Sequence, residues 1–303
     1  MKKLLIILIL ITTPHIAHGQ PAAYYHNNDN LKFLISNIID KRQSKASKEL
    51  LLAADTNNIK ELKKSIKNNA FINTRNINGE TPLIIASYKG NHIIVKELIK
   101  NGADVNKKDS RFGITPLSIA GMNGHSTIAE ELIIAGADVN TQNIYGSSPL
   151  RISTKNGKSE IVKILINNGA HVDIKADDKT TPLMTAFFGL YSNPFLTSEY
   201  EKIIKYLIAA GSDVNAVDAE GDSVLIWASG KAQSEINKEL KTANPSIKED
   251  SPYQAIPAIT KIKAIKFLIE SGANLNFQNK GLNALDWSYK YDYDLFTYLK
   301  SIR

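Results

Sequence analysis

Histidine is the residue type in this sequence best suited to bind a metal or to transfer a proton near neutral pH. Four of the six histidines lie beyond residue 19, namely His26, His92, His125 and His171. We predict that His92 and His125 stand at the beginnings of helices, where structural hydrogen bonding is a better interpretation than metal binding or catalysis. His171 replaces an aspartate of a recurring motif, and His26 precedes the regular part of the sequence.

No motif in the sequence supports catalysis. It contains no Gly-x-Ser-x-Gly elbow, no Gly-x-x-x-x-Gly-Lys phosphate loop and no His-Glu-x-x-His zinc helix. It also lacks cysteine, which excludes disulfides, thiolate zinc sites and cysteine nucleophiles. We therefore predict that the protein is not an enzyme and has no catalytic residues, no metal site and no cofactor.

Three aspartates recur in one sequence context, which raises the question of an acid and base pair. Asp104, Asp138 and Asp213 each occupy the third position of a motif of the form Gly-Ala/Ser-Asp-Val-Asn. A short polar side chain at such a position hydrogen-bonds its own backbone in a turn. Because the three motifs belong to separate repeats, we interpret these aspartates as turn residues and not as a catalytic pair.

Two markers recur in one register along the chain and define the repeat. The first marker is a helix-start tripeptide, found as Thr81-Pro82-Leu83, Thr115-Pro116-Leu117, Ser148-Pro149-Leu150 and Thr181-Pro182-Leu183, at spacings of 34, 33 and 33 residues. The second marker is the glycine-led exit motif, which begins at Gly102, Gly136, Gly169, Gly211 and Gly272. Such a period is typical of a stacked array of helical units.

These residues resemble the ankyrin repeat, whose pattern is a turn, a Thr-Pro-Leu helix start, two helices and a Gly-Ala-Asp-Val-Asn exit. The resemblance covers about residues 47 to 303. It implies an all-α fold, an ankyrin-repeat solenoid of helix-turn-helix units joined by β-hairpin-like turns. We place this solenoid after an N-terminal signal peptide, which the first nineteen residues indicate. One such hairpin cannot bury its own apolar face, so neighbouring units must stack to form one continuous core.

The residues of one unit explain where its helices begin and end. Thr81 can cap a helix, and Pro82 suits the first helical position because its missing N–H is not needed there. Gly90 should end this first helix. Gly102 should follow the second helix in a left-handed conformation, which favours glycine.

We divide the chain into a signal peptide (1–19), a polar leader (20–46) and a repeat domain (47–303). The seven units, five of them complete, are placed at about 47–75, 76–109, 110–142, 143–175, 176–217, 218–278 and 279–303. The fifth and sixth units carry insertions between their two helices, at about 189–197 and 232–258. The first is aromatic and ends at a helix start at Thr197 or Ser198, and the second is a proline-containing loop. Such loops can be functional or merely tolerated, and both interpretations stay open.

The first nineteen residues have the features of an export signal. Lys2 and Lys3 precede an apolar run, and Ala17-His18-Gly19 provides a small-x-small cleavage site, so we predict cleavage after Gly19. The apolar run is shorter than the roughly 20 residues of a membrane helix, which makes an uncleaved anchor the lesser alternative. The net charge of +7 falls to +5 without the two lysines and is spread along the chain, which argues against nucleic acid.

The sequence departs from the family at the position after Thr-Pro-Leu, where ankyrin repeats usually carry a histidine that ties repeats together. That position holds Ile84, Ser118, Arg151, Met184, Ile226 and Asp286. We therefore expect the polar ladder between repeats to be mostly missing and the repeats to cooperate through apolar packing.

In ankyrin proteins the turn tips and the exposed sides of the first helices form a concave surface that grips partners. The resemblance places fifteen residues of units two to four on it: Ile77, Asn78, Glu80, Tyr88, Lys89, Arg111, Phe112, Ile114, Met122, Asn123, Ile144, Tyr145, Ser147, Lys155 and Asn156. Tyr88, Phe112, Met122 and Tyr145 are large side chains of the type that dominates binding energy. The alternative is that Phe112 and Tyr145 pack against neighbouring turns.

The leading hypothesis for function is a non-catalytic scaffold, exported from a bacterial cytoplasm, that binds another protein through the concave face. We expect a monomer that is periplasmic or extracellular, without nucleic-acid partners and without stable membrane insertion after cleavage. A host-directed secreted effector is a variant of this hypothesis. An enzyme, or a binder of peptidoglycan or a small ligand, that uses the insertion in the sixth unit is the lesser alternative.

Overall fold

The computed structural model describes residues 45–231 and 258–302. Residues 43–303 form one compact unit. The predicted signal peptide and all but two residues of the predicted leader lie outside the described residues, as does the insertion at 232–258 except for its last residue. The first described helix begins at Lys45, two residues before the predicted start of the repeat domain.

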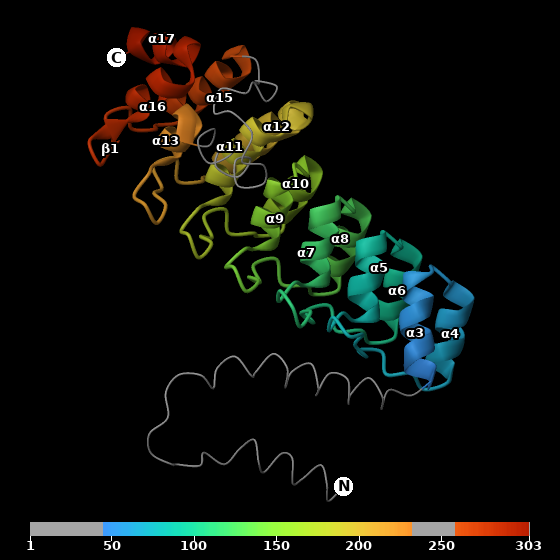
Figure 1. Ribbon diagram of the computed structural model, residues 1–303. Coiled ribbons are helices and arrows are strands. Elements are labelled where there is room, and N and C mark those ends of the chain that lie inside the picture. The colour runs from blue at the N-terminus through green and yellow to red at the C-terminus, as the bar shows by residue number, and fades with distance from the viewer. Residues whose placement is uncertain (1–44, 232–257, 303) are drawn as a thin grey trace, which may run out of the picture. The chain divides into compact units, whose positions relative to one another are not determined.

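The repeat domain is a stack of helix pairs (Figure 1). Within the described ranges the first helices of the seven units are α3 (Lys45–Asp55), α5 (Pro82–Lys89), α7 (Pro116–Asn123), α9 (Pro149–Lys155), α11 (Pro182–Ser192), α13 (Val224–Ile226) continued by η3 (Trp227–Lys231), and α16 (Ala284–Tyr291). The second helices are α4 (Ile59–Lys67), α6 (His92–Lys100), α8 (Ser126–Ile134), α10 (Ser159–Asn167), α12 (Thr197–Ala209), α15 (Ala258–Glu270) and α17 (Tyr293–Ser301). The first helix of each repeat unit contacts the first helix of the next unit, and second helices contact second helices in the same way. The repeat domain is therefore built of two helical layers.

The first helices of units two to six begin at side-chain caps. Thr81, Thr115, Ser148, Thr181 and Ser223 each accept a hydrogen bond from the backbone N–H three residues later, at 3.2–3.3 Å. Proline follows the cap in the first four cases and occupies the first helical position. These contacts confirm the predicted helix starts, because each cap satisfies a donor that has no partner within the helix.

The two glycines predicted to end the helices of unit two do so. Gly90 has a φ of 76° and stands at the end of α5. Gly102 has a φ of 83°, and the amides of Gly102 and Ala103 donate to the carbonyls of Ile99 and Leu98, both at 3.0 Å. This pairing satisfies the last carbonyls of α6 and turns the chain toward the next unit.

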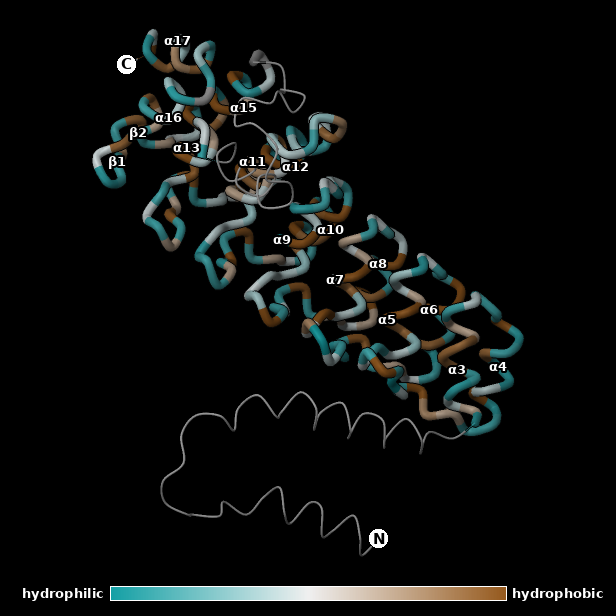
Figure 2. Tube along the Cα trace, in the orientation of Figure 1, coloured by the Kyte–Doolittle hydropathy of each residue, from teal (hydrophilic) through white to brown (hydrophobic). Residues whose placement is uncertain are grey.

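The hydrophobic core runs along the stack between the two layers. Its repeating members are leucines of the first helices (Leu83, Leu117, Leu150, Leu183) and of the second helices (Leu98, Leu132, Leu165, Leu207), all of which are buried. Figure 2 shows the hydrophobic residues recurring from one helix pair to the next. Since burial of one leucine stabilises a fold by about 1.5–3 kcal/mol, each added unit contributes similarly to the whole.

The insertion in the fifth unit lengthens the first helix and adds a short 3-10 helix, η2 (Pro194–Leu196), before α12. The second helix begins at Thr197, as the sequence predicted. Tyr200 is buried against Gly189, where an added Cβ would come within 2.1 Å of its ring. The Tyr200 hydroxyl donates to the Lys155 carbonyl at 2.8 Å, so α12, the helix that follows the insertion, is packed onto the fourth unit.

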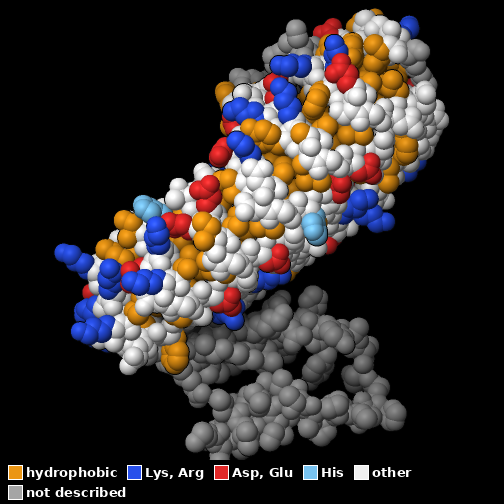
Figure 3. Space-filling model, turned by 180° about the vertical axis from the view of Figure 1, so that it is seen from behind, with side chains coloured by type: hydrophobic (Ala, Val, Ile, Leu, Met, Phe, Trp, Pro, Cys, Tyr) orange, Lys and Arg blue, Asp and Glu red, His pale blue; other side chains and the backbone are white. Residues whose placement is uncertain are grey.

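The last two units differ most from the repeat. In the sixth, a short α13 passes directly into the π-helical turn η3, in which Gly230 has a φ of 149°. In the seventh, β1 (Gln278–Asn279) pairs antiparallel with β2 (Leu282–Asn283), with Gln278 opposite Asn283. Seen from behind, Lys and Arg side chains gather at the first-unit end and again farther along the stack, and hydrophobic side chains lie between them over its whole length (Figure 3). Among the described residues no helix is both long and apolar enough to cross a membrane.

Candidate binding face

We call the surface made by the turn tips and the exposed sides of the first helices the first-helix face. On it, Tyr88, Phe112 and Tyr145 have exposed fractions of 56%, 37% and 55%. Ile77 and Ile144 at the turn tips are also exposed. Large apolar side chains therefore lie on the surface where the sequence placed them.

Phe112 and Tyr145 contact each other across two neighbouring turns. Their ring centroids are 6.4 Å apart, and the Arg111 guanidinium lies 5.3 Å from the centre of the Phe112 ring. The backbones beneath are joined by a hydrogen bond of 3.0 Å from the Ile144 amide to the Phe112 carbonyl. The alternative of packing against a neighbouring turn is thus realised in part, yet both rings keep more than a third of their surface exposed.

Tyr88 stands at a groove of about 510 Å³ between the first two units. Leu52 and Ile85 contribute apolar surface to this groove. Lys89 forms an ion pair with Asp55 at 3.0 Å on its rim. The groove extends the exposed apolar row toward the first unit.

The other predicted face residues differ in how far their side chains are exposed. Lys89, Arg111 and Lys155 are exposed, Ser147 is buried, and six residues are half-buried: Asn78, Glu80, Ile114, Met122, Asn123 and Asn156. Glu80 accepts from the Asn76 side-chain amide at 2.7 Å, and Asn123 donates to the Tyr88 carbonyl at 3.2 Å. Ser147 is only 5% exposed, because its hydroxyl accepts a hydrogen bond from Arg151 at 2.7 Å. The sequence placed Ser147 on the surface, and the structure buries it.

His92 and His125 stand at the beginnings of helices, as the sequence predicted. His92 is the first residue of α6 and His125 immediately precedes α8. The Nε2 atom of His125 lies 3.2 Å from the carbonyl oxygen of Tyr88 in the previous unit. Within the described residues no group of three or more His, Cys, Asp and Glu side chains is arranged to hold a metal.

A polar ladder between repeats is present, contrary to the expectation from the missing family histidines. It is built from the last residue of each exit motif: Asn106 accepts from the Asp138 amide at 2.8 Å and donates to the Gly136 carbonyl at 3.0 Å. Asn140 and Asn215 make the same two contacts with the units that follow them, at 2.8–3.2 Å. The sequence feature that could have predicted this ladder is the recurrence of asparagine at the last position of the exit motif, which the geometry of the turn alone does not require.

Asp173 replaces asparagine in this ladder. It accepts from the Asp213 amide at 3.1 Å but has no N–H to donate to the Gly211 carbonyl. Burial raises the pKa of Asp173, against the lowering effect of the hydrogen bond from the Asp213 amide, and the Asp213 carboxylate raises it further. The step of the ladder from the fourth unit to the fifth therefore contains one contact fewer and one unfavourable charge.

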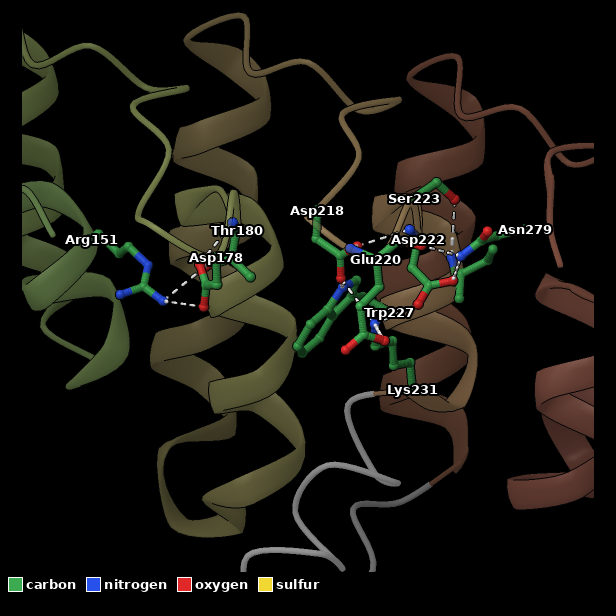
Figure 4. A network of polar contacts seen from close by, with 11 residues as sticks. Arg151, Asp178, Thr180, Asp218, Glu220, Asp222, Ser223, Trp227, Lys231 and Asn279 are labelled. Carbon is green, nitrogen blue, oxygen red and sulfur yellow. Dashed lines mark hydrogen bonds and ion pairs between the residues drawn. The ribbon is translucent and has the colours of Figure 1, made fainter. Parts of the chain in front are cut away.

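Two groups of polar contacts lie on the first helices and turns of units four to six (Figure 4). In the first, Arg151 donates to Thr180 at 2.8 Å and lies 3.7 Å from Asp178. The position that holds histidine in the family here carries an arginine that reaches the next unit. Arg151 was noted in the sequence only as a departure from the pattern, and its contacts were not foreseen.

The second group surrounds the buried Lys231. Its Nζ atom lies 2.9 Å from Asp218 and 3.0 Å from Glu220 and also contacts Asp222. Burial alone would lower the pKa of Lys231, but the hydrogen bonds to Asp222, Asp218 and Glu220 outweigh it and raise the pKa. Trp227 joins the group because its indole N–H donates to Asp218 at 2.9 Å. Since buried charges require partners, this cluster fixes the end of η3 to the preceding turn.

Comparison with known proteins agrees with this architecture. A family model described as ankyrin repeats in three copies matches residues 21–109, 50–143 and 117–193, together more than half of the chain. A putative ankyrin repeat protein of Rickettsia bellii (strain RML369-C) is 39% identical over 90 residues, which are 27% of this chain and 54% of that relative. The chain thus spans about half the length of the curated relative that it matches. Repeats of this kind are protein-interaction scaffolds and are typically not catalytic, and the chain belongs to the ankyrin-repeat family.

Proposed function

We propose that this protein is a non-catalytic scaffold, exported from a bacterial cytoplasm, that binds a protein partner through the concave face of its ankyrin stack. The observation that carries the proposal is the row of exposed Tyr88, Phe112 and Tyr145 on the first-helix face. Large aromatic side chains are enriched among the residues that dominate the free energy of binding at protein interfaces, and exposed apolar groups of this kind mark interaction surfaces.

The backbone under this row is held in place before any partner arrives. The Asn143 side chain accepts from the amides of Tyr145 and Ser147 at 3.0 and 2.9 Å, which closes the turn that carries Tyr145. The turn that carries Phe112 is closed in the same way by Asp109. A preformed surface loses less conformational entropy on binding, which favours affinity.

Affinity capture tests the proposal. The chain without residues 1–19 is immobilised, and proteins retained from the periplasmic fraction and the culture medium of the source bacterium are identified by mass spectrometry. The variant in which Tyr88, Phe112 and Tyr145 are all replaced by Ala should lose the retained partner while its thermal unfolding stays nearly unchanged, because all three side chains are exposed.

A matched control removes exposed apolar surface from the opposite layer. Ile93 on α6 and Ile134 on α8 are both exposed, and their replacement by Ala should leave capture intact. If the triple variant retains the partner as well as the unaltered chain does, the binding face lies elsewhere and the proposal fails.

Export is supported by the N-terminal sequence, in which Lys2 and Lys3 precede the apolar run and the Ala17-His18-Gly19 site. Mass measurement of the protein from the periplasmic fraction and from the medium should give a chain that begins at Gln20. A full-length chain confined to the cytoplasmic fraction would contradict this part of the proposal.

A further inference from the structure

A pocket of about 250 Å³ lies on the first-helix face where units four, five and six meet. Arg151 of α9 and Thr180 of the next turn contribute its polar side. Met184 and Phe188 of α11 and Trp227 of η3 contribute apolar walls. Arg151 and Met184 occupy the family's histidine position in successive units, so the departure from the family pattern forms this pocket.

The Arg151 guanidinium is desolvated and only partly satisfied. Its side chain is 18% exposed, and of its five N–H donors the structure assigns one to Ser147 at 2.7 Å and one to Thr180 at 2.8 Å. The nearest carboxylate, Asp178, is at 3.7 Å, which is an ion pair but not a hydrogen bond. The buried Nε atom has no acceptor among the described residues. A half-buried arginine with unused N–H donors gains free energy from a carboxylate that reaches it.

The apolar wall beside Arg151 is held rigidly. The Trp227 indole N–H donates to Asp218 at 2.9 Å, and the Lys231 ammonium lies 5.1 Å from the centre of its ring. Phe188 meets Trp227 edge to face, with ring centroids 6.5 Å apart. The buried cluster around Lys231 therefore holds Trp227 in place as one wall of the pocket, and Asp218 and Lys231 act on the pocket through Trp227.

We propose that this pocket receives an acidic side chain, Asp or Glu, together with an adjacent apolar side chain of the partner protein. The acidic group meets Arg151, whose planar guanidinium matches a carboxylate. The apolar side chain lies against Met184, Phe188 and Trp227. Lys155 at the rim and Arg151 outweigh the single charge of Asp178 among the lining side chains, which leaves a net charge of +1 to complement a carboxylate. This inference rests on the proposed function and names the partner chemistry that one part of the face selects.

The test uses an array of immobilised octapeptides with blocked termini, so that only side-chain carboxylates are offered. Each peptide carries Glu next to Leu, Met or Phe in a Gly and Ser background, and a matched series carries Gln in place of Glu. The chain without residues 1–19 should bind the Glu peptides about tenfold more tightly than the Gln peptides, a difference of about 1.4 kcal/mol, because only Glu offers a charged acceptor to Arg151. Anisotropy titrations with labelled copies of the same peptides give the ratio.

The variants separate the pocket from general charge effects. Arg151→Gln should abolish the preference for Glu, and Lys155→Gln, at an exposed position, should reduce it severalfold. Lys163→Gln makes the same charge change on the exposed side of α10 and should preserve the preference. Circular dichroism identifies any variant that fails to fold, and Lys155→Gln keeps the test valid if Arg151→Gln does.

Equal binding of the Glu and Gln series, including no binding of either, overturns the inference. The inference is also overturned if the preference for Glu is undiminished both in Lys155→Gln and in a correctly folded Arg151→Gln. Neither result bears on capture through Tyr88, Phe112 and Tyr145, so failure of the pocket and failure of the proposed function are distinguishable.

Discussion

Replacement of Asp173 by Asn should stabilise the protein, because it completes the ladder between repeats. At the equivalent place in the preceding unit, Asn140 accepts from the His171 amide at 2.8 Å and donates to the Gly169 carbonyl at 3.2 Å. Asp173 makes only the accepting contact. The Asn side chain would add a donor to the Gly211 carbonyl, a hydrogen bond that contributes about 0.5–1.5 kcal/mol.

The stabilisation should depend on pH, with a sign that follows from the raised pKa of Asp173. A carboxyl group whose pKa is higher in the folded state contributes stability below its ordinary value of 3.8, and this contribution is lost as the pH rises through the folded value. Asn does not titrate. The advantage of Asp173→Asn over the unaltered chain should therefore be larger at pH 7 than at pH 3.

Urea unfolding followed by far-UV circular dichroism at pH 7 and at pH 3 measures both effects. The reciprocal change Asn140→Asp is the matched control and should lower the unfolding midpoint at pH 7, since it removes the donor to Gly169 and places a charge near Asp138. If Asp173→Asn fails to raise the midpoint at pH 7, or raises it equally at both pH values, the account of the ladder is wrong.

Two further changes test the packing of single positions by the same unfolding measurement. Gly90→Ala should cost more than Gly102→Ala, since both glycines have positive φ but only at Gly90 would the new Cβ approach another residue, at 2.7 Å from the His125 ring; equal losses would mean that this contact is irrelevant. Lys231→Met should destabilise by about 3–5 kcal/mol because it leaves the buried carboxylates around it without a cation, and a loss below about 1 kcal/mol would show that the cluster is not a source of stability.

The helices of this protein are predictable because their ends depend on local chemistry. Thr81 with Pro82 fixes the start of α5, and Gly90 fixes its end, whatever the neighbours do. The same local rules place Thr197 at the start of α12 after the insertion. Exposure of Tyr88 and Tyr145 followed from their places in the repeat.

What the sequence could not give depends on contacts between units. Asn106 entered the sequence analysis only as the last residue of the exit motif. Its side chain bridges to the next unit, a contact that requires the distance between units to be known. Ser147 was placed on the surface by the resemblance to the ankyrin repeat, but its hydroxyl is hydrogen-bonded to Arg151 and the residue is buried. The pocket beside Arg151 could not be predicted either, because its lining residues come from three units. One of them, Trp227, lies on η3 of the sixth unit, whose π-helical turn has no counterpart in the repeat.

Hydrogen exchange of the captured complex tests directly whether the protein binds its partner with the first-helix face. Backbone exchange is compared by mass spectrometry between the free chain and the chain bound to the protein that it captures. If the partner binds this face, exchange in the bound chain should be slower in the turns that carry Ile77, Phe112 and Tyr145 and at the C-terminal ends of α5, α7 and α9. Protection confined to the second helices α6, α8 and α10, with those turns unchanged, would contradict it.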